Sequence, residues 1–215
     1  MFDSRGRGRG RGLGLGAGPV DTLAGIAPVL RQDGFPAIEV RMFPADAAEA
    51  LDLIRSLGAP VRLQRHVELV GEAGEALLAV LREQGIVVDE TFVRVGIVLH
   101  DAGKIRHPAE LQGPGSEHEP AGEAMLLAAG VAPELARVCR SHARWAAMDC
   151  RLEELAVALA DKLWKGARRG ELEERFIDAA AAAGATDRWA LFVALDSAFE
   201  RIAAGGPTRL ARSTL

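Results

Sequence analysis

Aromatic residues are scarce in this sequence. They account for 5% of its 215 residues, although 49% of the residues are hydrophobic. Alanine and leucine supply much of the apolar surface instead, and these residues favour helices that pack against one another. We therefore expect an all-α fold. The chain is long enough for one domain with a substantial core and some additional segments.

Cysteine and long apolar runs are also lacking. The two cysteines, Cys139 and Cys150, are too few for a disulfide framework and lack the spacing of a cysteine-pair metal site. No apolar run reaches the length of about 18 residues that a membrane-spanning helix needs, and the N-terminus lacks the apolar core of a secretory signal. These features predict a cytoplasmic protein without a membrane partner.

The chain has no excess of basic residues. With 26 Lys and Arg against 30 Asp and Glu, its formal net charge is -4. Such a chain lacks the positive field that drives generic nucleic-acid binding, so phosphate recognition has to be local and a nucleic-acid partner is not expected. Residues 1–18 depart from this pattern because they contain alternating Arg and Gly over 5–12. We expect a disordered, solvated tail there, with RNA contact as the alternative.

The remaining sequence predicts an N-terminal extension over 19–58, a helical domain over 59–204 and a frayed C-terminal tail over 205–215. Within the extension, Ile38, Val40 and Met42 alternate with polar residues in the manner of a short strand or extended arm. Capping residues and apolar periodicity then predict helices. These are expected over 46–56, 60–84, 89–103, 120–129, 133–147, 151–168, 171–183 and 187–203, with a loop over 106–119.

Polar residues suited to metal binding fall on the apolar faces of several of these helices. His66, His142 and Asp161 each share a helical stripe with apolar residues, so their side chains are expected to point inward. Taken singly, each histidine is also explained as a hydrogen-bonded core residue. A buried carboxylate needs a cationic partner, however, and a divalent metal with imidazole neighbours provides one. Mixed His and Asp ligands suit zinc, iron or manganese.

These residues also follow a known order. The segment 99–104 reads Leu-His-Asp-Ala-Gly-Lys, and 160–163 reads Ala-Asp-Lys-Leu. Together with a preceding helical histidine, the two strings resemble the signature of the HD superfamily of metal-dependent phosphohydrolases over roughly residues 58–170. The resemblance implies an all-α helical bundle and one metal held by His66, His100, Asp101 and Asp161.

Members of that superfamily with two metals have two further histidines between the His-Asp pair and the last aspartate. The histidines in these positions are His118 and His142, and 117–122 resembles the string around the first of them. The resemblance implies one or two divalent ions of the Mn, Fe or Zn type, with Asp101 bridging both ions where two are bound. It also implies that a metal-activated hydroxide attacks a phosphoester or pyrophosphate bond. The expected substrate is a nucleotide or a related small phosphorylated metabolite.

Three cations are candidates for substrate contact. Lys104 follows the His-Asp pair by three residues, where it would stabilise charge on the transferred phosphoryl group, and Asp101 and Lys104 are the expected catalytic residues. Lys165 and Arg168 lie four and seven residues after Asp161, on its helical face, and are candidate phosphate contacts. Two alternatives to the hydrolase stay open, a di-iron oxygenase of the HD fold and a non-catalytic regulatory or RNA-binding helical module.

Overall fold

All regular structure in the described part of the chain is helical. A computed structural model describes residues 44–184 and 186–213, which lie in one compact unit. This confirms the expected all-α class. The predicted tail over 1–18 and the arm up to residue 43 lie outside the described residues.

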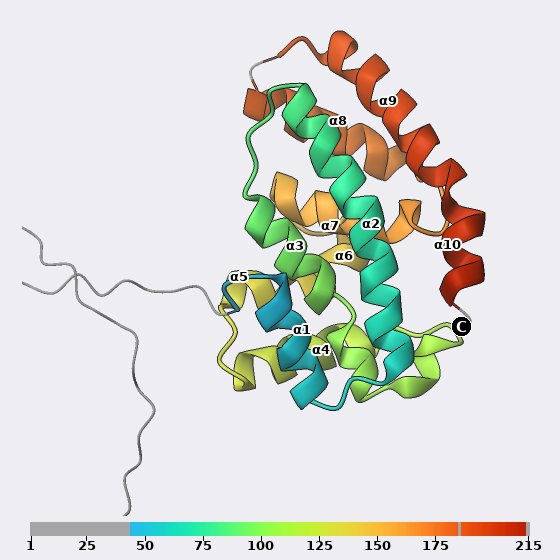
Figure 1. The fold of residues 1–215 in the computed structure, drawn as a ribbon. Helices are drawn as coiled ribbons and strands as arrows, with labels where there is room; N and C mark the ends of the chain where they lie inside the picture. The colour runs from blue at the N-terminus through green and yellow to red at the C-terminus, as the bar shows by residue number, and fades with distance from the viewer. Residues whose placement is uncertain (1–43, 185, 214–215) are drawn as a thin grey trace, which may run out of the picture. The chain divides into compact units, whose positions relative to one another are not determined.

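The first three helices bring the chain to the His-Asp pair. They are α1 (Ala47–Ser56), α2 (Val61–Glu83) and α3 (Glu90–Leu99), and Figure 1 shows α2 running along nearly the whole length of the described unit. The side chain of Asp46 accepts hydrogen bonds from two backbone amides of α1, and that of Asp89 accepts one from Phe92 of α3. These N-caps start the helices where the sequence predicts, because each carboxylate satisfies amides that have no partner within the helix.

Short elements follow the His-Asp pair. Two 3-10 turns, η1 (Ala102–Ile105) and η2 (Pro108–Leu111), lead to α4 (His118–Ala128). The predicted loop over 106–119 therefore contains one helical turn, and α4 begins two residues earlier than expected, at His118. The helix expected over 133–147 is divided into α5 (Pro133–Ala136) and α6 (Val138–Arg144), with Arg137 between them.

The C-terminal part consists of α7 (Leu152–Leu163), α8 (Gly170–Gly184), α9 (Arg188–Ala204) and α10 (Gly206–Ser213). The helix α7 ends five residues before the predicted end, because Gly166 adopts a φ of 82° that no helix interior accommodates. The prediction of a frayed tail from 205 is wrong for residues 206–213. They form α10, which is held to the body by Arg212 pairing with Glu72.

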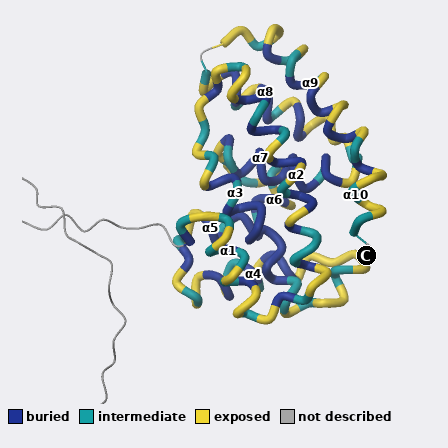
Figure 2. The backbone as a smooth tube through the Cα atoms, in the orientation of Figure 1, coloured by how far each residue is buried: buried dark blue, intermediate teal, exposed yellow. Residues whose placement is uncertain are grey.

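The helix α7 lies at the centre of the described unit. Ten of its 12 residues are buried, and Figure 2 shows it buried along nearly its whole length. The helices α2, α3, α6, α8 and α9 all pack against it. The helix α1, expected in a separate extension, buries Ala50 and Ile54 in the same apolar cluster as α3 and α4. None of the described helices is long and apolar enough to cross a membrane.

Candidate metal centre

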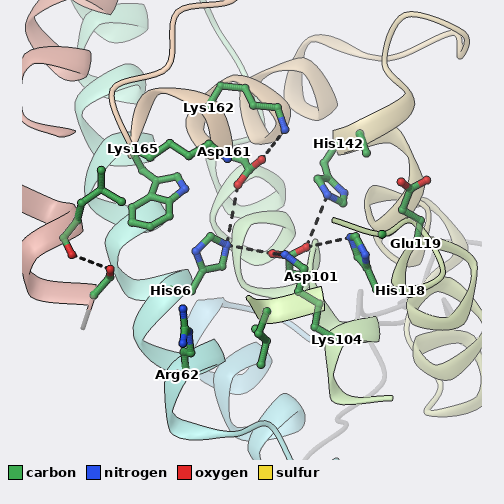
Figure 3. A pocket seen from close by; sticks show the side chains of 16 residues that line it. Arg62, His66, Asp101, Lys104, His118, Glu119, His142, Asp161, Lys162 and Lys165 are labelled. Atoms are coloured by element: carbon green, nitrogen blue, oxygen red, sulfur yellow. Dashed lines mark hydrogen bonds and ion pairs between the residues drawn. The ribbon is translucent and has the colours of Figure 1, made fainter. Parts of the chain in front are cut away.

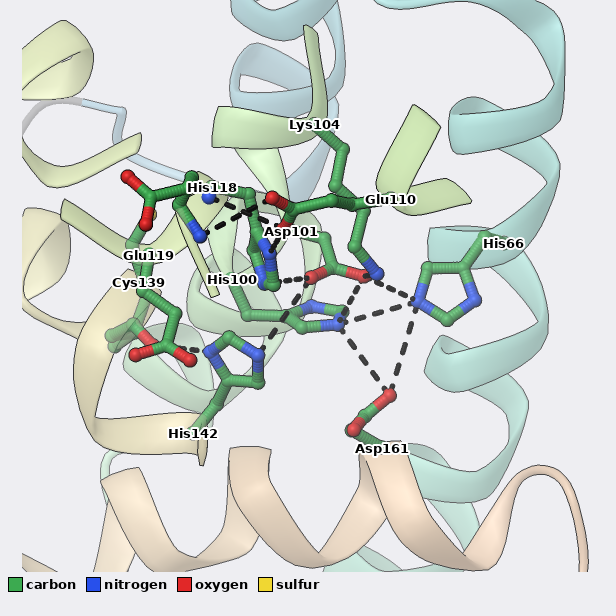
Figure 4. A network of polar contacts seen from close by, with 12 residues as sticks. His66, His100, Asp101, Lys104, Glu110, His118, Glu119, Cys139, His142 and Asp161 are labelled. Atoms are coloured by element: carbon green, nitrogen blue, oxygen red, sulfur yellow. Dashed lines mark hydrogen bonds and ion pairs between the residues drawn. The ribbon is translucent and has the colours of Figure 1, made fainter. Parts of the chain in front are cut away.

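The Asp101 carboxylate lies at the meeting point of four histidines. Its side chain is 3% exposed. Oδ2 lies 3.0 Å from Nε2 of His66 and 3.4 Å from Nε2 of His100. Oδ1 lies 3.3 Å from Nε2 of His118 and 3.7 Å from Nε2 of His142. Figure 4 shows Asp101 between His66 on one side and His118 and His142 on the other. Each carboxylate oxygen therefore faces its own pair of imidazoles.

The final aspartate completes the first of these two groups. Asp161 Oδ1 lies 3.9 Å from Nε2 of His66 and 3.7 Å from Nε2 of His100. The two imidazole nitrogens are themselves 3.3 Å apart. Helices α2, α3 and α7 supply these residues together with Asp101, which directly follows α3. The tetrad that the sequence indicated is thus assembled in space.

The hydrogen bonds of the buried histidines fix which nitrogen faces the carboxylates. Nδ1 of His100 donates to the carbonyl of Ile97 at 2.7 Å, and Nδ1 of His142 donates to the carbonyl of Val138 at 3.0 Å. A neutral imidazole whose Nδ1 carries the proton has a lone pair on Nε2. In that tautomer both Nε2 lone pairs point toward carboxylate oxygens, an arrangement that is repulsive unless a proton or a metal cation lies between them.

Two buried atoms in the second group have no hydrogen-bond partner in the described part of the chain. They are Oδ1 of Asp101 and Nε2 of His118, which face each other at 3.3 Å. Leaving a buried acceptor unsatisfied costs about 1–3 kcal/mol or more, and the cost is larger for a charged group. A cation bound by both atoms removes this cost, so the donor set fits a metal ion.

The electrostatics of the cluster agree with a site for positive charge. Burial raises the pKa of Asp101, but the surrounding histidines outweigh it and hold the pKa well below the ordinary value. For Asp161, the nearby imidazole of His100 and the charge of Lys162 likewise outweigh burial and lower the pKa. Burial lowers the pKa of His100, yet the two carboxylates raise it to about 9. Both aspartates are therefore anionic at neutral pH, as metal ligands must be.

His142 behaves in the opposite way. Burial lowers its pKa to about 3, and the positive charge of His100 adds to that effect. The imidazole of His142 is therefore neutral near pH 7, which leaves its Nε2 lone pair free to bind a metal. Two groups of residues bring their ligand atoms within 4.8 Å of one another, and Asp101 belongs to both. The first group adds His66 and His100, and the second adds His118 and His142.

Two carboxylates beside the cluster escaped the sequence reasoning. Oε2 of Glu110 accepts a hydrogen bond from Nδ1 of His118 at 2.5 Å, and Glu119 pairs with Arg144. Glu119 is buried, and its ion pair connects α4 to α6, the helices that carry His118 and His142. Glu110 lies in a loop without periodicity, so no pattern in the sequence singled it out. The clue for Glu119 was its place next to His118.

A cavity of about 430 Å³ opens onto the cluster, within the range of about 300–1,000 Å³ typical of small-molecule sites. Lys104, Lys162 and Lys165 line it, as Figure 3 shows. Nζ of Lys104 lies 2.6 Å from Oδ2 of Asp101, and Nζ of Lys162 lies 2.6 Å from Oδ2 of Asp161. Arg168 does not line this cavity, because its guanidinium pairs with Glu173 and Asp196. The helix ends before Arg168, so the stripe extrapolated from Asp161 does not reach it.

Comparison with known families agrees with the geometry. Residues 63–165, slightly less than half of the chain, match the family model described as HD domain. The chain thus contains an HD domain, the all-helical domain of the superfamily of metal-dependent phosphohydrolases. Most members of this superfamily are metal-dependent hydrolases. The searches of curated proteins and of solved structures returned no match.

Proposed function

We propose that this chain is a metal-dependent phosphohydrolase that cleaves a phosphomonoester, phosphodiester or pyrophosphate bond. The observation that carries the proposal is the position of Asp101, whose two oxygens face separate pairs of histidines beside a cavity lined by lysines. The first metal would be held by His66, His100, Asp101 and Asp161. His118, His142 and Asp101 would hold the second.

Divalent ions held by these residues would polarise a phosphoryl oxygen and lower the pKa of water from about 15.7 to about 7. The protein's own contribution is to place positive charge and to restrict water. Lys104 and Lys162 line the cavity and reach the two ligand carboxylates, so their ammonium groups lie where negative charge accumulates on a phosphoryl group. The burial of Asp101 and His142 keeps bulk water away from the centre and strengthens these interactions.

The expected substrate is a nucleotide or a related small phosphorylated metabolite. The cavity has room for more than a phosphoryl group, and its lining combines cations with the apolar side chains of Leu111, Trp164 and Leu210. This combination suits a ligand with an anionic end and a less polar body. Arg168 is not part of the proposal because it faces Glu173 and Asp196.

The cytoplasmic location expected from the sequence remains a prediction and belongs to the same proposal. Cys139 and Cys150 are both free, in keeping with a cytoplasmic protein. No particular feature of the described residues favours an oxygenase or an RNA-binding module.

The test is a hydrolysis screen with the full chain. Metal-free protein is loaded with Mn²⁺, Fe²⁺ or Zn²⁺ and incubated with nucleotides, dinucleotides and 4-nitrophenyl phosphate, and phosphate or nitrophenol release is measured in air and under nitrogen. We expect turnover that needs the metal but not dioxygen, and that Asp101→Asn abolishes. Consumption of dioxygen with product formed only in air would replace the hydrolase by an oxygenase. Salt-dependent RNA binding without turnover of any substrate would favour the binding module.

A further inference from the structure

The side of the cavity that lies beyond His66 is built from three separate parts of the chain. Arg62 comes from the first turn of α2, Trp164 and Lys165 follow α7, and Leu210 and Ser213 come from α10. We call these five residues the outer subsite. Figure 3 places Arg62 and Lys165 on the His66 side of the cavity, away from His118 and Glu119. Arg62, Leu210 and Ser213 lie outside the segment that matches the HD domain.

Lysine occurs in this chain only at the cavity. The sequence contains three lysines, at 104, 162 and 165, and all three line the cavity, whereas the remaining basic residues are arginines. Surface ion pairs elsewhere in the described residues use arginine, as in Arg82 with Glu90 and Arg188 with Asp178. The lysines are thus gathered at one place, where each provides a compact point charge on a flexible stem.

Two of the four Lys and Arg side chains that line the cavity have no acidic partner among the described residues. Lys104 and Lys162 are paired with Asp101 and Asp161. Arg62 and Lys165 are exposed, and neither forms an ion pair or a side-chain hydrogen bond with a described residue. Their charges are therefore available to a ligand. They are also separate from the pair of lysines that serve the metal centre.

The apolar wall of the outer subsite is firmly anchored. Arg209 of α10 donates to the carbonyl of Trp164 at 2.7 Å and to that of Leu163 at 3.2 Å, which satisfies the end of α7. Gly206 packs so closely on Gly166 that an added Cβ would lie 2.4 Å from the Gly166 nitrogen. These contacts hold α10 against α7, so that Leu210 and Trp164 line the same cavity.

The wall also presents an unused donor. Trp164 is 7% exposed, its ring meets that of His66 edge to face at 5.0 Å, and its buried indole N–H has no acceptor among the described residues. A buried donor without a partner is costly, and the residue that carries it lines the cavity.

We infer that the outer subsite binds a second phosphate of the substrate, in addition to the phosphoryl group that is hydrolysed at the metal centre. Arg62 and Lys165 would supply charge-assisted hydrogen bonds to that phosphate, and Trp164 and Leu210 would contact the part of the molecule that connects the two groups. This inference rests on the proposed function and narrows it to substrates that carry two phosphates.

Binding to the full chain, freed of metal so that no ligand is hydrolysed, tests this without turnover. Calorimetry compares adenosine 5′-monophosphate with ADP and with adenosine 3′,5′-bisphosphate, for the parent, for the double variant Arg62→Gln and Lys165→Gln, and for the control Arg201→Gln. Arg201 is exposed on α9, lacks an ion pair with a described residue and does not line this cavity. We expect at least one two-phosphate ligand to bind the parent and the control tenfold or more tightly than the monophosphate. The double variant should lose most of that preference.

Protection of lysine from acylation provides a second, independent measurement of ligand binding, since the three lysine side chains of this chain all line the cavity. Mass spectrometry after treatment with an acetylating reagent should show that the preferred two-phosphate ligand protects Lys165, whereas orthophosphate at equal concentration does not. Equal affinity of the parent for one and two phosphates, or an unchanged preference in the double variant, would overturn the outer subsite. A preference without hydrolysis of any ligand by the metal-loaded chain would instead refute the proposed function and leave the subsite in place.

Discussion

Glu110 and His118 form the closest contact between the loop after the His-Asp pair and the candidate metal centre. Oε2 of Glu110 accepts a hydrogen bond from Nδ1 of His118 at 2.5 Å. The same carboxylate accepts hydrogen bonds from the backbone amides of Glu117 and His118, at 3.2 and 3.4 Å. The contact places the proton on Nδ1 and leaves Nε2 to face Asp101, which is the tautomer that a metal ligand requires.

The first prediction follows from this contact. Glu110→Ala should weaken the binding of the second metal by about 10–100-fold, because His118 loses the group that orients its ring. Affinity for the first metal should change little, since His66 and His100 do not touch Glu110. Metal titration by calorimetry measures both affinities. The matched control is Glu117→Gln, because Glu117 is exposed and directly precedes His118 in the sequence. Equal loss of both metals would show that Glu110 supports the fold and not His118 in particular.

The second prediction concerns Gly103, two residues after Asp101. A Cβ on Gly103 would lie 1.8 Å from the backbone oxygen of His118 and 2.7 Å from the amide of Gly122. Backbone atoms cannot yield as a flexible side chain can, so Gly103→Ala should separate η1 from α4. We expect a loss of stability of about 1–3 kcal/mol or more in chemical denaturation, together with loss of the second metal.

Gly113→Ala in the same loop is the control for this change. Its Cβ would meet only the oxygen of Ala109, at the ordinary contact distance of 3.7 Å. If Gly103→Ala is as stable as Gly113→Ala, the close packing of η1 on α4 is not what holds Asp101 beside His118.

A third prediction separates charge stabilisation from metal binding. Lys104→Ala removes an ammonium group 2.6 Å from Asp101 but no candidate metal ligand. We expect an unchanged metal content and a kcat lower by about 100-fold, comparable to the loss of one electrostatic contact in other enzymes. Steady-state kinetics and elemental analysis check this against Arg106→Ala, an exposed neighbour. Normal kinetics on every active substrate would remove Lys104 from the mechanism.

The fourth prediction is the pH dependence of the metal-free chain. The folded-state pKa of His100 is raised from 6.5 to about 9, so its stabilising contribution is complete below pH 6.5 and is lost as the pH rises through 9. That contribution is on the order of 3 kcal/mol. His142 acts in the other direction, since its pKa is lowered to about 3 and stability is lost as the pH falls from 6.5 toward 3. The free energy of unfolding should therefore be greatest near pH 6.5.

Metal should reverse the alkaline part of this profile. A ligand histidine must be deprotonated, so the ion replaces the proton of His100 and binds more tightly as the pH rises from 6.5 to 9. Thermal unfolding across this range should show a falling Tm for metal-free protein and a growing difference from the metal-loaded protein. His107→Gln, outside the cluster, should give the same profile. A metal-free Tm that rises from pH 6.5 to 9 would contradict the assignment of His100.

The residues of the candidate metal centre could be predicted from the sequence better than the residues around it. His66, His142 and Asp161 share helical stripes with apolar residues, and a stripe fixes the direction of a side chain. His118 was expected beside a helix, and it is the first residue of α4. Periodicity alone could not bring these helices together, because the distances between them depend on close packing such as that of Gly103 on His118.

Helical periodicity could not predict the role of residues that lie outside periodic segments. Glu110 lies in a 3-10 turn where no helical stripe indicates the direction of its side chain, and nothing in the sequence distinguishes it from Glu117. The helix α10 begins with a glycine and a proline, residues that are typical of turns and chain ends, yet Arg209 and Arg212 hold it through partners far away in the sequence. Arg168 was assigned to the wrong face because α7 stops before it.

Metal content tests the central claim most directly. Elemental analysis of the full chain, after equilibration with manganese, iron or zinc and removal of free ion, should find two metals per chain. The double variant His118→Ala and His142→Ala should keep one metal, held by His66, His100, Asp101 and Asp161, and should lose far more activity than stability. One metal in the parent, or no loss of metal in the double variant, would contradict a two-metal centre bridged by Asp101.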